Sequence, residues 1–370
     1  MKRIITQLAA CSFVILLVSF LPKTELPGRA NEMAVIAYYS GNSKAINNFQ
    51  VGKLTHIIFS FCHLKGNRLQ VDDAEDSATI RKLVSLKKEH PTLKILLSLG
   101  GWGGCEYCSP VFATDNGRQE FARSVKELND YFQTDGIDLD WEYPAIEGYP
   151  GHQYQRVDRN NFTALVKAIR EQVGPSSLIS FAAGGFNEYL KKAIEWKEVM
   201  TIVDFVNLMS YDLVNGFSLT TGHHTALYST YAQEESVDNG VRYMLSQGVP
   251  SQKIVIGAAF YARGWERVAN TNNGLYQAGK FKSFIPYRQF DTRLSADSGF
   301  VFYRDSVARA PYAYNPSRRL FATFDNEASI RQKTEYVKQK DLGGIMFWEL
   351  TLDRYENGLL DVIDRTKNEK

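Results

Sequence analysis

The chain has 370 residues, of which 44% are hydrophobic, 13% aromatic and 23% charged, a balance typical of a globular protein with one large domain or two smaller ones. The formal net charge is only +2, so the sequence carries no electrostatic signal for binding nucleic acid or an acidic membrane surface.

The N-terminal segment has the layout of a secretory signal peptide. A short positive region, MKR, precedes an uncharged apolar run at 8–21 that is too short for a comfortable membrane span. The small residues of GRA place cleavage near Ala30, so we expect residues 1–30 to be removed from an exported protein, periplasmic or secreted. Cys11 lies before the end of the apolar run rather than after it, which disfavours lipidation. An uncleaved anchor is the remaining alternative.

Eight β-type runs follow along the chain, most of them separated by amphipathic segments. The predicted strands cover 33–40, 54–64, 93–101, 136–144, 178–185, 205–212, 253–264 and 343–350. Helical patterns between them include 78–90, 118–133 and 159–173. Apolar strands that alternate with helices indicate parallel pairing with both faces covered. Eight such units predict an α/β protein with a closed (β/α)8 TIM barrel.

The segment between the seventh and eighth predicted strands is much longer than one helix needs. It is rich in aromatic and β-branched residues with turn formers between them, which predicts a small α+β insertion at 266–329. We therefore assign 31–265 and 330–370 to the barrel.

The fourth predicted strand, within DGIDLDWEYP at 135–144, carries carboxylates in an apolar setting. Asp138, Asp140 and Glu142 share one face because strand side chains alternate. In a barrel that face points inward, with Glu142 nearest the C-terminal rim where active sites form. Three carboxylates in a row repel one another unless some are protonated or hydrogen-bonded, so a structural role is costly. The alternative, an exposed edge strand, is disfavoured by Trp141 and the neighbouring strands.

This segment resembles the D-x-x-D-x-D-x-E signature of glycoside hydrolase family 18, the chitinase family. Four more segments resemble family motifs in the family order: SLGGW at 98–102, LMSYDL at 208–213, FYAR at 260–263 and MFWEL at 346–350. The insertion resembles the chitinase insertion domain of the deeper-cleft subgroup. The resemblance covers almost the whole mature chain.

The resemblance implies retaining, substrate-assisted endo- or exo-hydrolysis of β-1,4-linked N-acetylglucosamine polymers or oligomers, such as chitin. Glu142 would be the general acid and base, and the substrate's own 2-acetamido group would be the nucleophile. Asp140 would orient that group, and Asp138 would share a proton with Asp140. Tyr211 would hydrogen-bond the acetamide carbonyl.

The same motifs imply a set of sugar-binding residues. Trp348 would form the floor of the site, Asp212 would bind the sugar that is cleaved, and Met209 would line the acetamide pocket. Ser98 would hydrogen-bond the buried aspartate. The other candidates are Tyr38, Phe59, Trp102, Tyr143, Tyr261 and Arg263. A core role for Trp348 and a loop-anchor role for Trp102 are the structural alternatives, and Ala262 replaces the glycine that the family has before the arginine.

Three cysteines remain after the predicted cleavage. Cys105 and Cys108, spaced Cys-x-x-Cys in an exported protein, are candidates for a disulfide, and Cys62 is expected to pack as a buried thiol. We expect no cofactor and no metal. Two cysteines are too few for a zinc site, and the adjacent His223 and His224 point apart on an extended backbone, which favours a structural role.

Other functions share this barrel. An endo-β-N-acetylglucosaminidase acting on N-glycans, a hydrolase of peptidoglycan fragments and a non-catalytic chitin-binding lectin are the alternatives. The presence of Glu142 disfavours the lectin, and the insertion favours a linear chain. We expect a monomer that binds chitin or N-acetylglucosamine oligosaccharides, prefers soluble or short chains, and has no nucleic-acid partner and no stable membrane insertion after signal cleavage.

Overall fold

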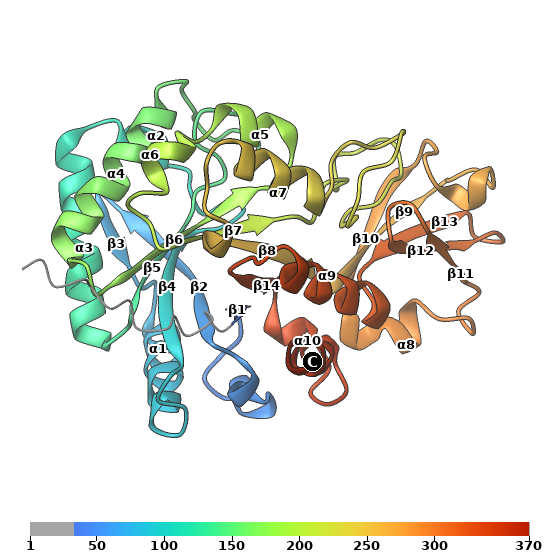
Figure 1. The fold of residues 1–370 in the computed structure, drawn as a ribbon, viewed down its shortest axis with the longest axis horizontal. Helices are drawn as coiled ribbons and strands as arrows, with labels where there is room; N and C mark the ends of the chain where they lie inside the picture. Colours follow the sequence, from blue (N-terminus) through green and yellow to red (C-terminus); the bar gives the residue numbers. More distant parts are fainter. Residues whose placement is uncertain (1–32, 370) are drawn as a thin grey trace, which may run out of the picture. The chain divides into compact units, whose positions relative to one another are not determined.

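A closed barrel of eight parallel strands forms most of the computed structural model, which describes residues 33–369 (Figure 1). The barrel strands are β1 (Ala34–Tyr39), β2 (His56–Lys65), β4 (Lys94–Gly100), β5 (Gly136–Asp140), β6 (Leu178–Gly184), β7 (Phe205–Met209), β8 (Ile254–Ala259) and β14 (Gly344–Trp348). Pairing of β1 with both β14 and β2 closes the ring. The TIM-barrel prediction is therefore confirmed.

Two predicted strands differ from the observed ones. The fourth strand ends at Asp140, so Glu142 and Tyr143 lie on the loop just beyond the C-terminal end of β5. The predicted strand 253–264 is two strands, because the chain leaves the barrel after β8 and continues as β9 (Tyr261–Glu266) in a second sheet. The FYAR motif thus bridges the two sheets instead of lying on a barrel strand.

Helices connect the barrel strands, as the alternating pattern predicts. They are α1 (Ala74–Ser85), α2 (Cys108–Phe112), α3 (Asp115–Phe132), α4 (Asp158–Val173), α5 (Asn187–Lys192), α6 (Trp196–Val199), α7 (Val237–Ser246), α9 (Glu327–Gln339) and α10 (Leu359–Asn368). Local sequence sets their ends. In α3, for example, the Thr114 side chain accepts a hydrogen bond from the Gly117 amide, and Gln133 ends the helix in the left-handed conformation. The short hairpin strand β3 (Arg68–Gln70) pairs with β2.

The insertion between β8 and β14 is a five-stranded antiparallel sheet with one short helix. Its strands run in the order β10 (Lys280–Pro286), β9, β13 (Leu320–Phe324), β12 (Ala310–Asn315) and β11 (Val301–Asp305), and its helix is α8 (Phe290–Arg293). Trp265, Val268 and Phe321 belong to a hydrophobic cluster of its own, separate from the barrel core. The predicted α+β insertion is therefore present.

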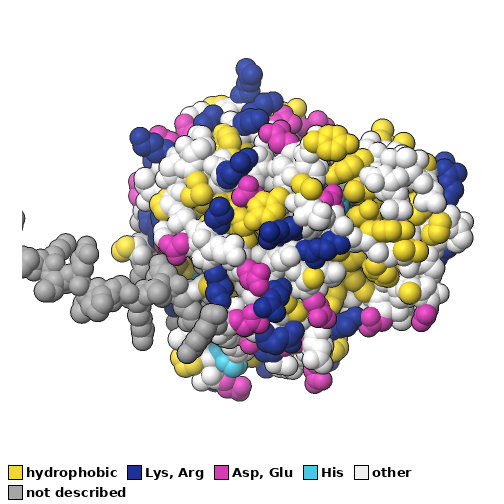
Figure 2. Space-filling view, turned by 45° about the vertical axis from the view of Figure 1, so that its right-hand side comes forward, with side chains coloured by type: hydrophobic (Ala, Val, Ile, Leu, Met, Phe, Trp, Pro, Cys, Tyr) yellow, Lys and Arg dark blue, Asp and Glu magenta, His cyan; other side chains and the backbone are white. Residues whose placement is uncertain are grey.

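Charge is mixed on the face drawn in Figure 2, where Lys and Arg side chains alternate with Asp and Glu and apolar side chains gather toward the right. Among residues 33–369, no helix is both long and apolar enough to span a bilayer. The predicted signal peptide and its cleavage near Ala30 lie outside the described residues.

Candidate active site

Asp138 is held at the centre of the barrel by hydrogen bonds to both of its carboxylate oxygens. Strand register places Ser98 of β4 and Ser180 of β6 on either side of it. Oδ2 accepts hydrogen bonds from the Tyr38 hydroxyl and the Ser98 hydroxyl, both at 3.0 Å. Oδ1 accepts from the Ser180 hydroxyl at 2.6 Å and from Asn207 Nδ2 at 3.1 Å. Burial raises the pKa of Asp138, and these donors oppose the rise because they stabilise the charged form.

Asp140 has a different environment two residues further along β5. It is buried, and its Oδ1 has no hydrogen-bond partner among the described residues. Burial, the charge of Glu142 and the charge of Asp138 all raise the pKa of Asp140 well above its ordinary value. We therefore take Asp140 as the neutral, protonated member of the group. Gly100 lets the neighbouring loop approach it, since a Cβ there would lie 2.3 Å from the Asp140 carbonyl oxygen.

Glu142 follows on the loop at the C-terminal rim of the barrel. Its side chain is buried, and burial raises its pKa to about 7, with the negative charge of Asp212 adding to the rise. A carboxyl group with a pKa near neutrality can both donate and accept a proton at physiological pH. This position suits a general acid.

Asp212 is the ionised carboxylate of the site. Arg263 Nε donates to Oδ1 at 2.8 Å, and the same guanidinium also donates to Oδ2, so the pair is bidentate. The Nδ1 atom of buried His224 lies 3.5 Å from Oδ1. Burial alone would raise the pKa of Asp212, but His224 and Arg263 hold it below its ordinary value. Arg263 thus binds Asp212 across the junction between the two sheets.

Trp348, at the end of β14, is flanked by aromatic rings. Phe61 stacks against it with ring centroids 5.6 Å apart, and Tyr38 lies at 5.8 Å. Phe59, the predicted sugar-binding residue of β2, is 2% exposed and belongs to the barrel core. Phe61, which the sequence analysis did not select, is therefore the β2 aromatic beside Trp348.

Two other candidates lie at the end of β7 and just beyond it. Tyr211 and Met209 are buried at the end of β7, and the Tyr211 hydroxyl lies 3.8 Å from the sulfur of Met346. Burial raises the pKa of Tyr211 well above its ordinary value, and the charges of Asp140, Glu142 and Asp212 add to the rise. Tyr211 is therefore close to all three carboxyl groups.

Tyr261 is less accessible than the sequence analysis expects. It is 1% exposed and packs between the rings of Tyr211, His224 and Phe284. A direct contact with a sugar would need this packing to open, whereas Arg263 keeps a partly exposed side chain.

Trp102 lies on the loop after β4. Its ring contacts Tyr143, Tyr149 and Phe217, and 48% of the side chain is exposed. Cys105 and Cys108 form a disulfide in the same loop, and Cys62 is a buried free thiol. The disulfide thus closes a short covalent ring three residues after Trp102.

The sequence analysis missed several residues of this site. Ser180 and Asn207 are polar residues within apolar strands, which is the signal that selected Asp138. His224 was assigned a structural role, yet it lies beside Asp212. Its neighbour His223 instead contacts Asp305 at 3.1 Å. Within residues 33–369 no group of three His, Cys, Asp or Glu side chains is arranged to hold a metal.

The sequence is similar to those of known glycoside hydrolases. The model of glycosyl hydrolases family 18 matches residues 34–353. Chitinase A1 of Niallia circulans is 33% identical over 310 residues, covering 76% of this chain and 44% of the relative. Chitotriosidase-1 of Mus musculus is 31% identical, covering 82% and 68%.

Among solved structures, a family 18 N-acetylglucosaminidase from Paenibacillus barengoltzii is 37% identical with a TM-score of 0.82. The match covers 90% of this chain and 99% of that one.

Proposed function

This chain belongs to glycosyl hydrolases family 18, and on that basis we propose that it hydrolyses β-1,4-linked N-acetylglucosamine chains, with retention and with the substrate's 2-acetamido group as nucleophile. The observation that carries the proposal is the pair formed by Glu142, whose pKa is raised to about 7, and Asp140, whose buried Oδ1 has no partner among the described residues.

Glu142 acts as the acid in the first step. Its proton is transferred to the glycosidic oxygen as the bond to the anomeric carbon breaks, which leaves Glu142 as a carboxylate. In the second step that carboxylate takes a proton from the attacking water. A pKa near 7 supports both roles because neither protonation state is strongly disfavoured.

Asp140 assists the acetamide instead of attacking the sugar itself. A protonated carboxyl group is a poor nucleophile but a good hydrogen-bond donor, and its raised pKa keeps Asp140 protonated. We propose that a carboxyl oxygen of Asp140 accepts a hydrogen bond from the acetamide N–H, while the Asp140 proton is directed toward Asp138. The N–H bond orients the acetamide so that its carbonyl oxygen closes on the anomeric carbon. Asp138, held by four donors, lies below Asp140 on the same strand, and we propose that the two aspartates share one proton and one negative charge.

The remaining contacts position the sugar. Trp348 provides the stacking surface, Tyr211 binds the acetamide carbonyl, and Met209 lines that pocket. The Asp212–Arg263 pair binds hydroxyl groups from the side of the insertion, which we propose forms one wall of the cleft. We propose that the catalytic barrel comprises 31–260 and 330–370. The sequence-based boundary at 265 is too late, because β9 belongs to the sheet of the insertion.

A second function has a specific observation in its favour. The solved relative at 37% identity is described as an N-acetylglucosaminidase. Release of single N-acetylglucosamine units from chain ends would use the same acid and the same acetamide chemistry. The two functions differ only in how many sugars bind on each side of the broken bond.

Product analysis tests both functions. The chitin hexasaccharide would be incubated with the enzyme, and products would be separated by length while the anomeric signals are followed by NMR. We expect β-anomers first, with disaccharides from a chitinase and monosaccharides from an N-acetylglucosaminidase. Release of high-mannose glycans without cleavage of the hexasaccharide would indicate the N-glycan function. Initial α-anomers would contradict the retaining mechanism.

A matched substrate pair tests the acetamide. Two chromogenic disaccharides would differ only in carrying an N-acetyl group or a free amine on the sugar that is cleaved. Comparable turnover of both would contradict substrate assistance. We also propose that the protein is exported and monomeric, which fractionation and light scattering would test.

A further inference from the structure

Tyr211 and Asp212 lie on a segment beyond β7 that is held at both of its ends. The Ser210 carbonyl, which belongs to the peptide group before Tyr211, accepts a hydrogen bond of 3.1 Å from the Thr225 hydroxyl. The Leu213 amide donates at 3.1 Å to the peptide carbonyl that directly precedes Thr225. Tyr211 and Asp212 therefore lie between two hydrogen bonds made by one neighbouring segment.

Asp212 has a backbone conformation that needs such support. Its φ is +54°, in the left-handed region that is uncommon for residues other than glycine. A conformation of this kind persists where the surrounding contacts determine it. The turn that carries Tyr211 and Asp212 therefore depends on the contacts that hold its ends.

Ser210 is also fixed to the adjacent barrel strand, β8. Its hydroxyl donates to the Gly257 carbonyl at 3.1 Å and accepts from the Gly257 amide at 2.9 Å. A Cβ at Gly257 would lie 2.9 Å from a ring carbon of Tyr211, so β8 packs closely against that ring. The side chain of Ser210 is thus held by β8, and its carbonyl oxygen is held by Thr225.

A buried ion pair orients Thr225. Lys333 of α9 donates to the Thr225 hydroxyl oxygen, and its Nζ also lies 2.6 Å from Oδ2 of Asp325. All three residues are at most 2% exposed. The same Oδ2 atom accepts a hydrogen bond of 3.0 Å from the Ala259 amide at the end of β8. The cluster thus joins α9 and β8 to Thr225.

The Thr225 hydroxyl has one proton and two acceptors near it, the Ser210 carbonyl at 3.1 Å and Asp325 Oδ2 at 3.2 Å. Asp325 Oδ2 already accepts from Lys333 and from the Ala259 amide. Lys333 also polarises the hydroxyl by donating to its oxygen, which makes the hydroxyl a stronger donor. We therefore expect the Thr225 proton to be directed at the Ser210 carbonyl.

We propose that Thr225 is a positioning residue, which holds the peptide group before Tyr211 so that the Tyr211 hydroxyl reaches the acetamide carbonyl of the substrate. The inference rests on the proposed function and deepens it. Thr225 is 2% exposed, so it acts through Tyr211 and not on the sugar itself. The Lys333–Asp325 pair acts one step further away, because it orients the Thr225 hydroxyl.

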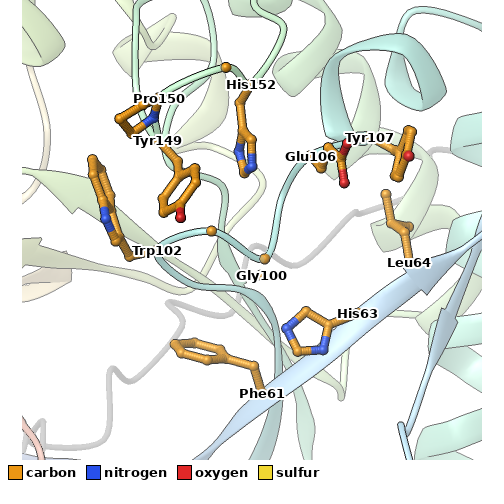
Figure 3. Close-up of a pocket in the computed structure, with 13 residues that line it drawn as sticks. Phe61, His63, Leu64, Gly100, Trp102, Glu106, Tyr107, Tyr149, Pro150 and His152 are labelled. Carbon is orange, nitrogen blue, oxygen red and sulfur yellow. The ribbon is translucent and has the colours of Figure 1, made fainter.

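Three substitutions test this role. Thr225→Val keeps the branched shape and removes the hydroxyl, whereas Thr225→Ser keeps the hydroxyl. Thr334→Val is the matched control, because this threonine of α9 is fully buried and its hydroxyl donates within its own helix, to the Ile330 carbonyl at 2.9 Å. Neither threonine lines the pocket beside Trp102 that Figure 3 shows, so the substitutions do not alter the walls of that pocket.

We expect Thr225→Val to lower kcat for the acetylated chromogenic disaccharide by about tenfold, with a smaller change in KM, because a displaced Tyr211 hydroxyl loses most of its effect in the transition state. Thr225→Ser should keep most of the activity. Thr334→Val should lower Tm and leave kcat unchanged. Equal kcat in folded Thr225→Val and Thr334→Val would overturn the inference. If Thr225→Val does not fold, Thr225→Ala, which also lacks the hydroxyl, takes its place.

A double-mutant cycle tests whether Thr225 acts through Tyr211. Thr225→Val would be combined with Tyr211→Phe, which already lacks the hydroxyl that Thr225 is proposed to position. The added substitution should then cost little more activity, because residues that act as a unit are not additive. The same further loss with and without the Tyr211 hydroxyl would overturn the inference.

Binding measurements separate this inference from the proposed function. Calorimetry in the Glu142→Gln background would give the affinity for the chitin disaccharide. If the wild type hydrolyses nothing while Thr225→Val weakens binding only when Tyr211 is intact, the catalytic proposal is wrong and the positioning role is supported. If hydrolysis proceeds and Thr225→Val behaves as Thr334→Val does, only the positioning role is wrong.

Discussion

The hydroxyl of Ser180 donates a hydrogen bond of 2.6 Å to Oδ1 of Asp138, and both side chains are wholly buried in the barrel. Together with Tyr38, Ser98 and Asn207, Ser180 gives this carboxylate a full set of donors. The negative charge on Asp138 is therefore stabilised by hydrogen-bond donors from the neighbouring strands.

Removal of this donor tests the arrangement. Ser180→Ala leaves Oδ1 with Asn207 alone, so we expect unfolding free energy to fall by about 1–3 kcal/mol and kcat to fall more than KM changes. Denaturant unfolding and steady-state kinetics measure these effects. Ser246→Ala, at the exposed end of α7, is the control. Unchanged kcat in the Ser180 variant would show that the donor has no part in activity.

The pH dependence of activity should report Glu142. Its pKa is raised to about 7, so the acid form is present below that pH and is lost as pH rises through it. We expect kcat/KM for a chromogenic disaccharide to decline above about pH 7.

The charge of Asp212 contributes to that pKa. Asp212→Asn should therefore move the decline to lower pH, whatever its effect on the maximum rate, while Asp130→Asn, an exposed carboxylate of α3, should not move it. A decline at the same pH in both variants would contradict the assignment.

The ionisation of Glu142 should also lower the stability of the folded protein. Because the folded-state pKa of Glu142 lies above its ordinary value, ionisation between about pH 4.5 and 7 costs folded-state stability. We expect Glu142→Gln to raise Tm by about 1–3 °C at pH 8 and to leave it unchanged at pH 4, where both forms are neutral. Scanning calorimetry at the two pH values measures this. A lower Tm for the variant at pH 8 would contradict the raised pKa.

The buried pair of Lys333 and Asp325 should matter for folding. Lys333 Nζ lies 2.6 Å from Asp325 Oδ2, and both side chains are at most 1% exposed. Lys333→Met leaves the carboxylate unpaired, so we expect a loss of about 3–5 kcal/mol in unfolding free energy. Arg331→Met, on the exposed face of the same helix, should leave the unfolding free energy nearly unchanged, because water screens its ion pairs. Similar losses in the two variants would show that burial of the pair is unimportant.

His223 and His224 are adjacent in the sequence but should have different roles, His224 in activity and His223 in stability. His224 lies against Asp212 and Tyr261, so His224→Asn should lower kcat/KM by about tenfold through misplaced Asp212. His223 pairs with Asp305 of the insertion, so His223→Asn should lower Tm with kcat/KM retained. Kinetics and thermal unfolding on both variants make the comparison, and a reversed pattern would refute it.

Sequence reasoning found the parts of the site that local patterns encode. Alternation placed Asp138 and Asp140 on the inward face of β5, and eight apolar runs separated by amphipathic segments indicated eight barrel units. In β2, pairing with β4 shifts register between Phe59 and Cys62, which no pattern in the sequence reveals. Phe59 was chosen from the family resemblance, and alternation could not separate it from Phe61, because the two residues share a parity; the irregular pairing puts Phe61 against Trp348.

Contacts between distant segments were beyond sequence reasoning. The run 253–264 has strand-forming residues throughout, so nothing local reveals that the chain changes sheets at Phe260. His224 reaches Asp212 only because the intervening loop folds back, and Arg263 reaches it from the second sheet. The path of such a loop is determined by tertiary packing, and the residue pattern of a single segment does not predict it.

The most direct test of the central claim is hydrolysis of a chromogenic N,N'-diacetylchitobioside by wild-type protein and by Glu142→Gln. We predict turnover by the wild type and a loss of at least about 100-fold in the folded variant, with binding of chitin oligomers retained. Equal turnover in both would contradict the role of Glu142. Binding without turnover in the wild type would contradict the enzyme itself and leave a sugar-binding protein.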